Sequence, residues 1–169
     1  MPQRPRRSAI VMLGVVALVA LALDVVSKLL VVRDVDPARP IRLLGGLIHI
    51  VYTRNPGAAF SIGTGATFIF GLVAVVVIVV IVRSARRIRS LWWSLGLGLL
   101  LGGASGNLSD RLFRAPGVMR GHVVDWIQFP HFAIFNLADS AIVGGGILLA
   151  VLGLLGIEMD GRRTPKSKA

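Results

Sequence analysis

The chain has 169 residues, of which 54% are hydrophobic and 16% charged, and its formal net charge is +11. Soluble domains carry about 25% charged residues, so this composition excludes an ordinary soluble protein and predicts a single membrane domain. Cysteine is absent, which excludes disulfides, thiolate catalysis and cysteine zinc sites.

The apolar residues collect into four blocks, each long enough to cross a bilayer. A helix of about 20 residues at ~1.5 Å each covers the ~30 Å of hydrocarbon. The first block follows a basic stretch and could be read as a cleavable signal peptide, but its apolar pattern continues past Ala22, so we expect a retained helix. The predicted spans are about 10–32, 66–82, 91–109 and 132–157.

Basic residues mark one side of the predicted bundle. Eleven of the nineteen lie before the first span, between the second and third, or after the fourth. The positive-inside rule makes that side cytoplasmic, which places both chain ends, 1–9 and 158–169, inside. The segments 33–65 and 110–131 then face outward. This placement fits anionic lipid headgroups, and we expect no nucleic-acid partner.

Two outer segments have the composition of short strands. Residues 47–55 and 122–129 are rich in β-branched and aromatic side chains in partial alternation, and glycine or proline bounds them. We therefore predict an all-α membrane protein of four transmembrane helices, residues 10–157, with a small extracytoplasmic sheet.

Asp125 and Asp139 are the main candidates for chemistry. The chain has only eight acidic residues, and a carboxylate near lipid costs several kcal/mol unless it is protonated, paired or hydrated. If the turn at 129–131 folds the second strand back over the fourth span, both carboxylates converge there. Two such groups share one proton and their pKa values split, which is the ground state of an aspartyl protease.

Each aspartate also has a simpler interpretation. Asp125 is compatible with a solvated surface position, the commonest place for aspartate. Asp139 stands three residues after Asn136, the spacing of an N-cap followed by an acidic third residue, and such a cap stabilises a helix by about 1 kcal/mol.

Other polar residues in or near the spans predict supporting roles. Asp24 and Lys28 are four residues apart on the first span, and we expect an ion pair that maintains the architecture. Asn55 offers an amide beside a Pro-Gly turn that precedes the small residues 58 and 59. Asn107 and Arg111 share a helix face, where either packing or the binding of a polar substrate explains them.

Five sequence motifs, taken together and in order, resemble those of the lipoprotein signal peptidase family, also called signal peptidase II. The resemblance covers the whole chain. Trp126 stands where the family often has phenylalanine, a tolerable aromatic exchange. The motifs are DVVSK (24–28), TRNPGAAFS (53–61), GGASGNLSDRL (102–112), HVVDWI (122–127) and FNLADS (135–140).

The resemblance implies an aspartic endopeptidase of the bacterial inner membrane. Such an enzyme removes the signal peptide of a prolipoprotein on the amino side of a diacylglyceryl-modified cysteine, without a metal or other cofactor. Asp125 and Asp139 take the catalytic positions, and Asp24 and Lys28 match positions important for the fold or activity. The family fold implies a β-cradle and a mobile outer lid, and we expect a monomer. The polar positions around the site are matched by Asn55, Asn107, Arg111 and Asn136.

Three rival functions follow from the same residues. A small proton-coupled transporter would use intramembrane acids, but it predicts an internal repeat and acids at mid-membrane, and neither is present. A metallopeptidase would draw on His122 and His131, whose spacing does not match HExxH. A serine–lysine protease would need Ser27 and Lys28 to face each other, but adjacent helical residues point about 100° apart.

Overall fold

Helices dominate the computed structural model, which describes residues 7–57 and 65–163. The helices are α1 (Arg7–Asp34), α2 (Gly65–Ser84), α3 (Leu91–Phe113) and α4 (Leu137–Leu154). The strands and single-turn 3-10 helices are β1 (Ile41–Leu43), η1 (Leu44–Gly46), β2 (Ile48–Asn55), η3 (Ala85–Arg87) and β3 (Val123–Gln128). The small residues Ala58 and Ala59 and parts of both basic chain ends lie outside the described residues.

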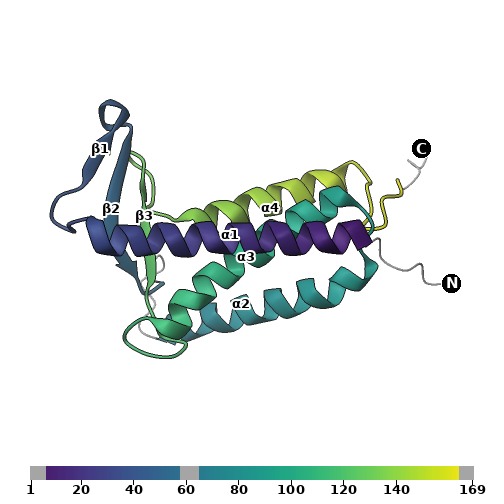
Figure 1. The fold of residues 1–169 in the computed structure, drawn as a ribbon, viewed down its shortest axis with the longest axis horizontal. Coiled ribbons are helices and arrows are strands. Elements are labelled where there is room, and N and C mark those ends of the chain that lie inside the picture. The colour runs from purple at the N-terminus through teal and green to yellow at the C-terminus, as the bar shows by residue number, and fades with distance from the viewer. Residues whose placement is uncertain (1–6, 58–64, 164–169) are drawn as a thin grey trace.

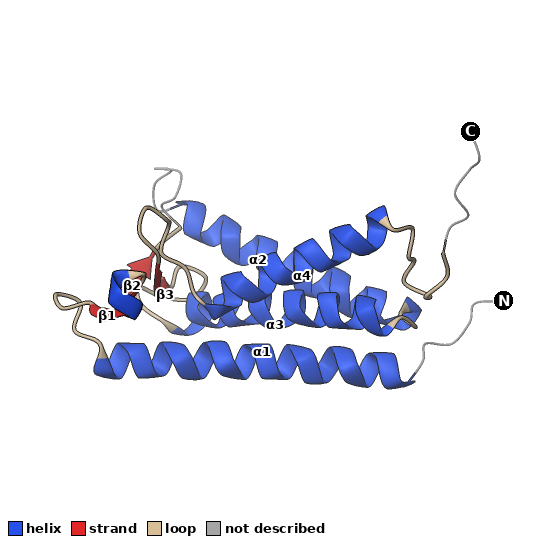
Figure 2. Ribbon diagram, turned by 90° about the horizontal axis from the view of Figure 1, so that it is seen from above, coloured by secondary structure: helices blue, strands red, loops and turns tan. Residues whose placement is uncertain are grey.

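The helices run along the longest axis of the molecule, with the sheet across one end (Figures 1 and 2). The first residue of α1 and the last residue of α4 lie at the end of the bundle that is opposite the sheet. α3 is the central helix, because it packs against each of α1, α2 and α4. Its first turn is capped by Ser90, whose hydroxyl accepts a hydrogen bond from the Trp93 amide.

Glycines on two faces of α3 allow its close packing. A Cβ at Gly102 would lie 2.6 Å from the carbonyl oxygen of Ala17 on α1, and one at Gly103 would lie 2.5 Å from the carbonyl oxygen of Ala138 on α4. Small residues of this kind let the backbones of membrane helices approach each other. The glycines lower the hydropathy of α3 but allow its close contact with α1 and α4.

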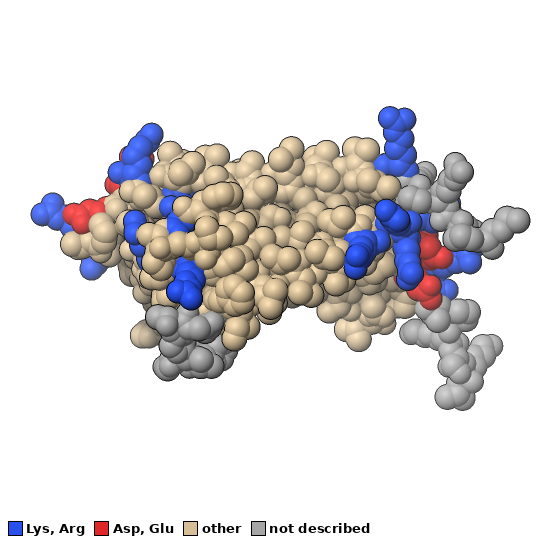
Figure 3. Space-filling view, turned by 90° about the horizontal axis from the view of Figure 1, so that it is seen from below, with Lys and Arg blue, Asp and Glu red and all other residues tan. Residues whose placement is uncertain are grey.

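Three of the helical segments are long and apolar enough to cross a membrane, namely Arg7–Asp34, Thr67–Arg87 and Leu137–Leu154. On the face shown in Figure 3, charged side chains gather at the two ends and leave an uncharged belt between them. The prediction of a helical membrane protein with a small sheet is therefore confirmed. The fourth crossing, predicted at 91–109, stays a prediction.

The sheet has the order β1-β2-β3, and both pairings are antiparallel. The strands predicted within 47–55 and 122–129 are present as β2 and β3. β1 was not predicted, because three residues after a proline are too few to show an alternating pattern. In the β2–β3 register Thr53 lies opposite Asp125 and Asn55 opposite Val123, which brings the Asn55 side chain to the level of Asp125.

The segment after β3 folds back, which is the condition that the sequence analysis set for the two carboxylates to converge. The Phe132 amide donates to the carbonyl oxygen of Phe129, and Phe135 then pairs with Ile127 in an antiparallel bridge. The fold-back places Asn136, the N-cap of α4, beside β3.

Candidate active site

Asp125 lies in the middle of β3 with its side chain directed into the molecule, and only 3% of the residue is exposed. Its Oδ2 accepts a hydrogen bond of 2.8 Å from Asn55 Nδ2, and its Oδ1 accepts one of 2.6 Å from Asn136 Nδ2. The surface position considered from the sequence is therefore wrong.

Asp139 combines the capping role with a place in the site. The Asn136 side chain accepts from the Asp139 amide at 2.9 Å, and Asp139 Oδ2 accepts from the Asn136 amide at 3.2 Å, so the capping box is complete. The other oxygen of Asp139 accepts a 2.7 Å hydrogen bond from Asn107 Nδ2. One carboxylate thus stabilises the start of α4 and faces the polar side chains of α3.

Two asparagine amides connect the aspartates. Asn136 Nδ2 donates to Asp125 and, at 3.3 Å, to Asn107 Oδ1, while Asn107 Nδ2 donates to Asp139. A continuous hydrogen-bond chain therefore runs from Asp125 through Asn136 and Asn107 to Asp139. The structure brings the two predicted carboxylates into one site at the sheet end of the bundle.

Lys28 is the buried cation beside this chain. Its Nζ lies 2.8 Å from Asp24 Oδ2 and 2.9 Å from Asp110 Oδ2, and it donates a 3.0 Å hydrogen bond to Asn107 Oδ1. Lys28 and Asp24 are completely buried. Asp24 Oδ1 also accepts from the Ala138 amide at 2.9 Å, which ties α1 to the first turn of α4. The ion pair predicted from the four-residue spacing is confirmed.

Asp110 is a buried member of the site that the sequence interpretation missed. Besides Lys28 it accepts from the Val124 amide of β3 at 3.2 Å, and its other oxygen pairs with Arg114 Nε. The available signal was its position on α3, three residues after Asn107, in a chain with only eight acidic residues. Asp110 joins α1, α3 and β3 next to Asp125.

Arg111 is buried on α3, and its guanidinium lies over the Phe70 ring at 5.6 Å from the centroid. It interacts electrostatically with both Asp125 and Asp139. Its Nη1 is buried without a hydrogen-bond partner among the described residues. An unsatisfied buried donor costs free energy, so this atom is available to an acceptor that the described residues do not supply.

Burial raises the pKa of the Asp125 carboxyl from its ordinary value of 3.8 to about 6. The hydrogen bonds from Asn55 and Asn136 favour the ionised form and act in the opposite direction, while the negative charge of Asp139 raises the pKa of Asp125 further. Asp125 therefore binds a proton more readily than an ordinary aspartate does.

The chemistry available here is that of paired carboxylates. One ionised and one protonated carboxyl at the same site can activate a water molecule and polarise a carbonyl group. Among the described residues no group of three or more histidine, aspartate or glutamate side chains could hold a metal ion, so His122 and His131 form no such site with Asp125.

Residues 16–155 match the family model described as signal peptidase (SPase) II. The chain is 52% identical to the lipoprotein signal peptidase of Rhodococcus jostii, over 96% of this chain and 82% of that protein. It is also 52% identical to the lipoprotein signal peptidase of Streptomyces coelicolor, over 95% of this chain and 79% of that protein. A bacterial membrane enzyme solved by the in meso method at 1.9 Å resolution superposes with a TM-score of 0.76 and 26% identity, covering 91% of this chain and 97% of that one.

Replacing Lys28 with methionine should destabilise the protein strongly, because Asp24 and Asp110 would then lack their buried counter-ion. Breaking a buried pair in this way costs about 3–5 kcal/mol of the free energy of unfolding. Thermal unfolding in detergent, together with the yield of folded protein, measures the loss.

Arg33→Met is the matched control, since it removes another cation from α1 whose ion pair with Asp34 is exposed. An exposed pair contributes about 0–1 kcal/mol, so this variant should unfold close to the wild type. Equal stability of the Lys28 and Arg33 variants would contradict the structural role of Lys28.

Proposed function

Since the chain belongs to the signal peptidase II family, we propose that it removes signal peptides from prolipoproteins as an aspartic endopeptidase whose reacting groups are Asp125 and Asp139. The observation that carries the proposal is the hydrogen-bond chain joining the two carboxylates through Asn136 and Asn107. Such a connected pair supplies an acid and a base to the same substrate.

In the proposed reaction the ionised aspartate takes a proton from a water molecule as the water oxygen attacks the scissile carbonyl carbon. The protonated aspartate donates a hydrogen bond to the carbonyl oxygen and stabilises the charge that develops there. The tetrahedral intermediate then collapses, the C–N bond breaks, and the aspartate that took the proton from water donates it to the leaving amine. The products are a carboxylic acid and an amine, and the pair again holds a single proton.

The environments of the two residues favour Asp125 as the protonated partner. Asp125 is the more deeply buried residue, and its pKa is raised to about 6. Asp139 lies in the first turn of α4, where the helix dipole and the backbone amide of Asn136 stabilise a negative charge. Asp139 is therefore the proposed base, and Asp125 the proposed acid.

The polar residues around the pair have separate proposed roles in orienting the carboxylates, binding the substrate and supporting the fold. Asn55, Asn107 and Asn136 each donate a side-chain hydrogen bond to a carboxylate, so their proposed role is to orient the pair beside the substrate. Arg111 Nη1, which has no hydrogen-bond partner within residues 7–57 and 65–163, is the proposed donor to a carbonyl oxygen of the substrate chain. Asp24 and Lys28 support the architecture.

The fourth crossing is proposed for α3. The helix has 23 residues, about 34 Å at 1.5 Å per residue, and its buried charged residues, Asp110 and Arg111, lie in its last turn beside the sheet. Its glycines face α1 and α4 rather than lipid, which accounts for its lower hydropathy.

Four crossings give a proposed topology for the inner-membrane protein. The many arginines of η3 and the adjoining residues lie at the end opposite the sheet, so this end is cytoplasmic by the positive-inside rule. Both chain ends are then cytoplasmic, and the carboxylates lie at the extracytoplasmic surface. The proposed domain covers 10–157, with basic ends at 1–9 and 158–169.

The proposed substrate is a prolipoprotein whose cysteine already carries a diacylglyceryl group, cut on the amino side of that cysteine by a monomeric enzyme without a cofactor. A signal peptide is an apolar helix held in the bilayer. A protease for it must offer its carboxylates at the lipid surface, and the position of the candidate site at the sheet end of the helical bundle supports this proposal.

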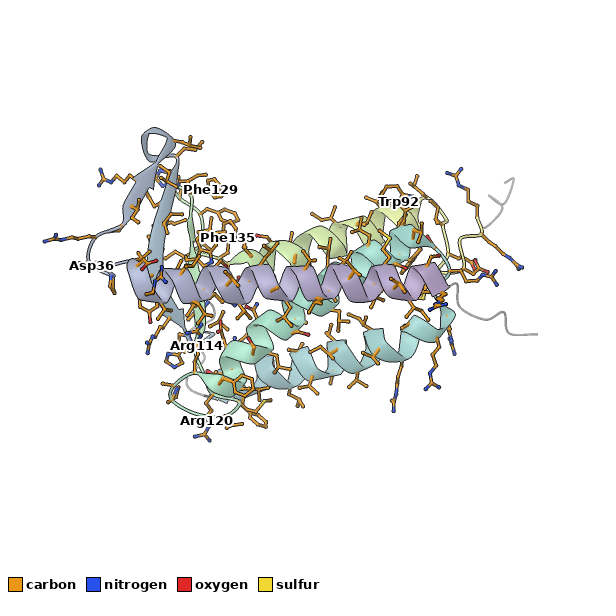
Figure 4. The ribbon with its side chains drawn as sticks, in the orientation of Figure 1. Asp36, Trp92, Arg114, Arg120, Phe129 and Phe135 are labelled. Carbon is orange, nitrogen blue, oxygen red and sulfur yellow. The ribbon has the colours of Figure 1, made fainter. Side chains whose placement is uncertain are left out.

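Replacing either Asp125 or Asp139 with asparagine should lower the cleavage of a diacylated precursor by about 10²–10⁴-fold, the usual contribution of general acid–base catalysis. Mass spectrometry of the precursor before and after incubation with detergent-solubilised protein reports both the rate and the cut site. The control is Asp36→Asn, an exposed aspartate beyond the end of α1 (Figure 4). An Asn variant of either candidate that is folded and fully active would refute the pair.

The rate should also depend on pH through Asp125. If the protonated form is the acid, kcat/KM falls as the pH rises through about 6, because the proton is then lost. Asn55→Ala removes a hydrogen bond that favours the ionised carboxylate, so the falling limb should move to higher pH. His122→Gln is the control and should leave the limb in place. A rate that instead rises through pH 6 would assign the base role to Asp125.

A further inference from the structure

The tip of the β1–β2 hairpin carries large apolar side chains that the described protein does not cover. Leu44 is 74% exposed and Leu47 is 57% exposed. These values match those of apolar side chains on the outer surface of α1, where Leu18 is 66% and Leu29 56% exposed. By exposure alone, the tip resembles the lipid-facing surface of the bundle rather than a loop in water.

The backbone of the tip holds this exposure in place. Leu44, Gly45 and Gly46 have φ values of +51°, +68° and +95°, and the Leu47 amide closes the turn on the carbonyl oxygen of Leu44 at 3.3 Å. Glycine adopts the left-handed region freely, but leucine does so rarely. Leu44 therefore holds a backbone conformation that is unfavourable for leucine, with its side chain exposed.

The two faces of the hairpin differ in polarity. Directly opposed residues of an antiparallel pair share a face, so Ile41 lies with Ile50 and Leu43 with Ile48. The alternate pair, Arg42 with His49, lies on the other face. The hairpin is therefore amphipathic across its thickness.

The apolar face is directed toward the membrane side. Ile50 packs against the cluster formed by Val31, Val35 and Val124, at the outer end of α1. Ile48 and Leu43 lie on the same face but closer to the tip. In Figure 1 the hairpin lies across the end of the bundle, and its tip extends beyond the side of the bundle. At the tip, the described protein therefore leaves this face uncovered.

An aromatic group lies on the same side. Phe129 and Phe135 are stacked with centroids 6.0 Å apart, and Phe132 packs edge-on against Phe135 while 64% exposed. In Figure 4 Phe129 and Phe135 lie between the hairpin and α4. Phenylalanine, like leucine, is among the side chains that interfacial elements bury at the boundary of headgroups and acyl chains, so this group supports a boundary near the hairpin.

From this geometry we propose that the η1 tip inserts into the outer leaflet, with Leu44 and Leu47 among the lipid acyl chains. Its occupant is lipid because the apolar face continues the membrane surface of α1, while Arg42 on the opposite face stays in water. An interfacial element of this kind reaches about 5–10 Å into the headgroup and acyl boundary. β2 leads from the tip to Asn55, so the inserted tip also fixes the height of Asp125 above the lipid.

The absence of cysteine makes a direct test possible. Leu44→Cys and, separately, Leu47→Cys are labelled with a polarity-sensitive fluorophore in protein reconstituted into phosphatidylethanolamine–phosphatidylglycerol nanodiscs. Arg42→Cys is the matched control on the opposite face of the hairpin. Quenching is measured with a lipid that carries a nitroxide near the headgroup and with aqueous iodide.

We expect the labels at 44 and 47 to emit at shorter wavelength, to be quenched by the nitroxide lipid and to be shielded from iodide, with the reverse for the label at 42. Two results would overturn the proposal. Iodide quenching at 44 and 47 as strong as at 42 places the tip in water, and shielding from both quenchers shows that protein, such as a second copy of the chain, covers it. Neither outcome depends on catalytic activity.

Discussion

The buried Lys28 ammonium is the charge around which the sheet end of the bundle is organised. Removing such a group from water costs several kcal/mol, which only close counter-ions and hydrogen bonds can offset. Asp24 and Asp110 supply the negative charges, and each also binds a backbone amide of another element: Asp24 that of Ala138 in α4, and Asp110 that of Val124 in β3. One cation therefore fixes the two elements that carry the candidate catalytic aspartates.

The charges of the same neighbourhood favour the proposed state in which the pair holds one proton. If Asp139 is ionised and Asp125 protonated, three positive and three negative side chains balance at the site. They are Lys28, Arg111 and Arg114 against Asp24, Asp110 and Asp139. Loss of the Asp125 proton would leave an uncompensated negative charge in buried surroundings, in agreement with its raised pKa. An enzyme that works at a lipid surface gains from this neutrality, because an unbalanced charge is expensive there.

Local patterns in the sequence were enough to predict the helices, β2, β3 and the pair of Asp24 and Lys28, since run length, alternation and four-residue spacing are local properties. The convergence of Asp125 and Asp139 required one further assumption, the fold-back after β3, which the structure confirms. Asp110 escaped prediction because its contacts with Lys28 and Val124 come from elements distant in the chain, and β1 because three residues are too few to show alternation. The catalytic roles of Asp125 and Asp139 remain predictions, as does the fourth membrane crossing.

The central claim is that the two carboxylates form one titrating unit. Carbon-13 NMR of carboxyl-labelled aspartate, with the Asp125 signal assigned from its absence in Asp125→Asn, measures the pKa of Asp125 in the wild type and in Asp139→Asn. The account predicts a pKa of about 6 in the wild type and a lower one in the variant, because the negative charge of Asp139 that raises it is gone. An Asp125 pKa that does not change when Asp139 is replaced would contradict the account.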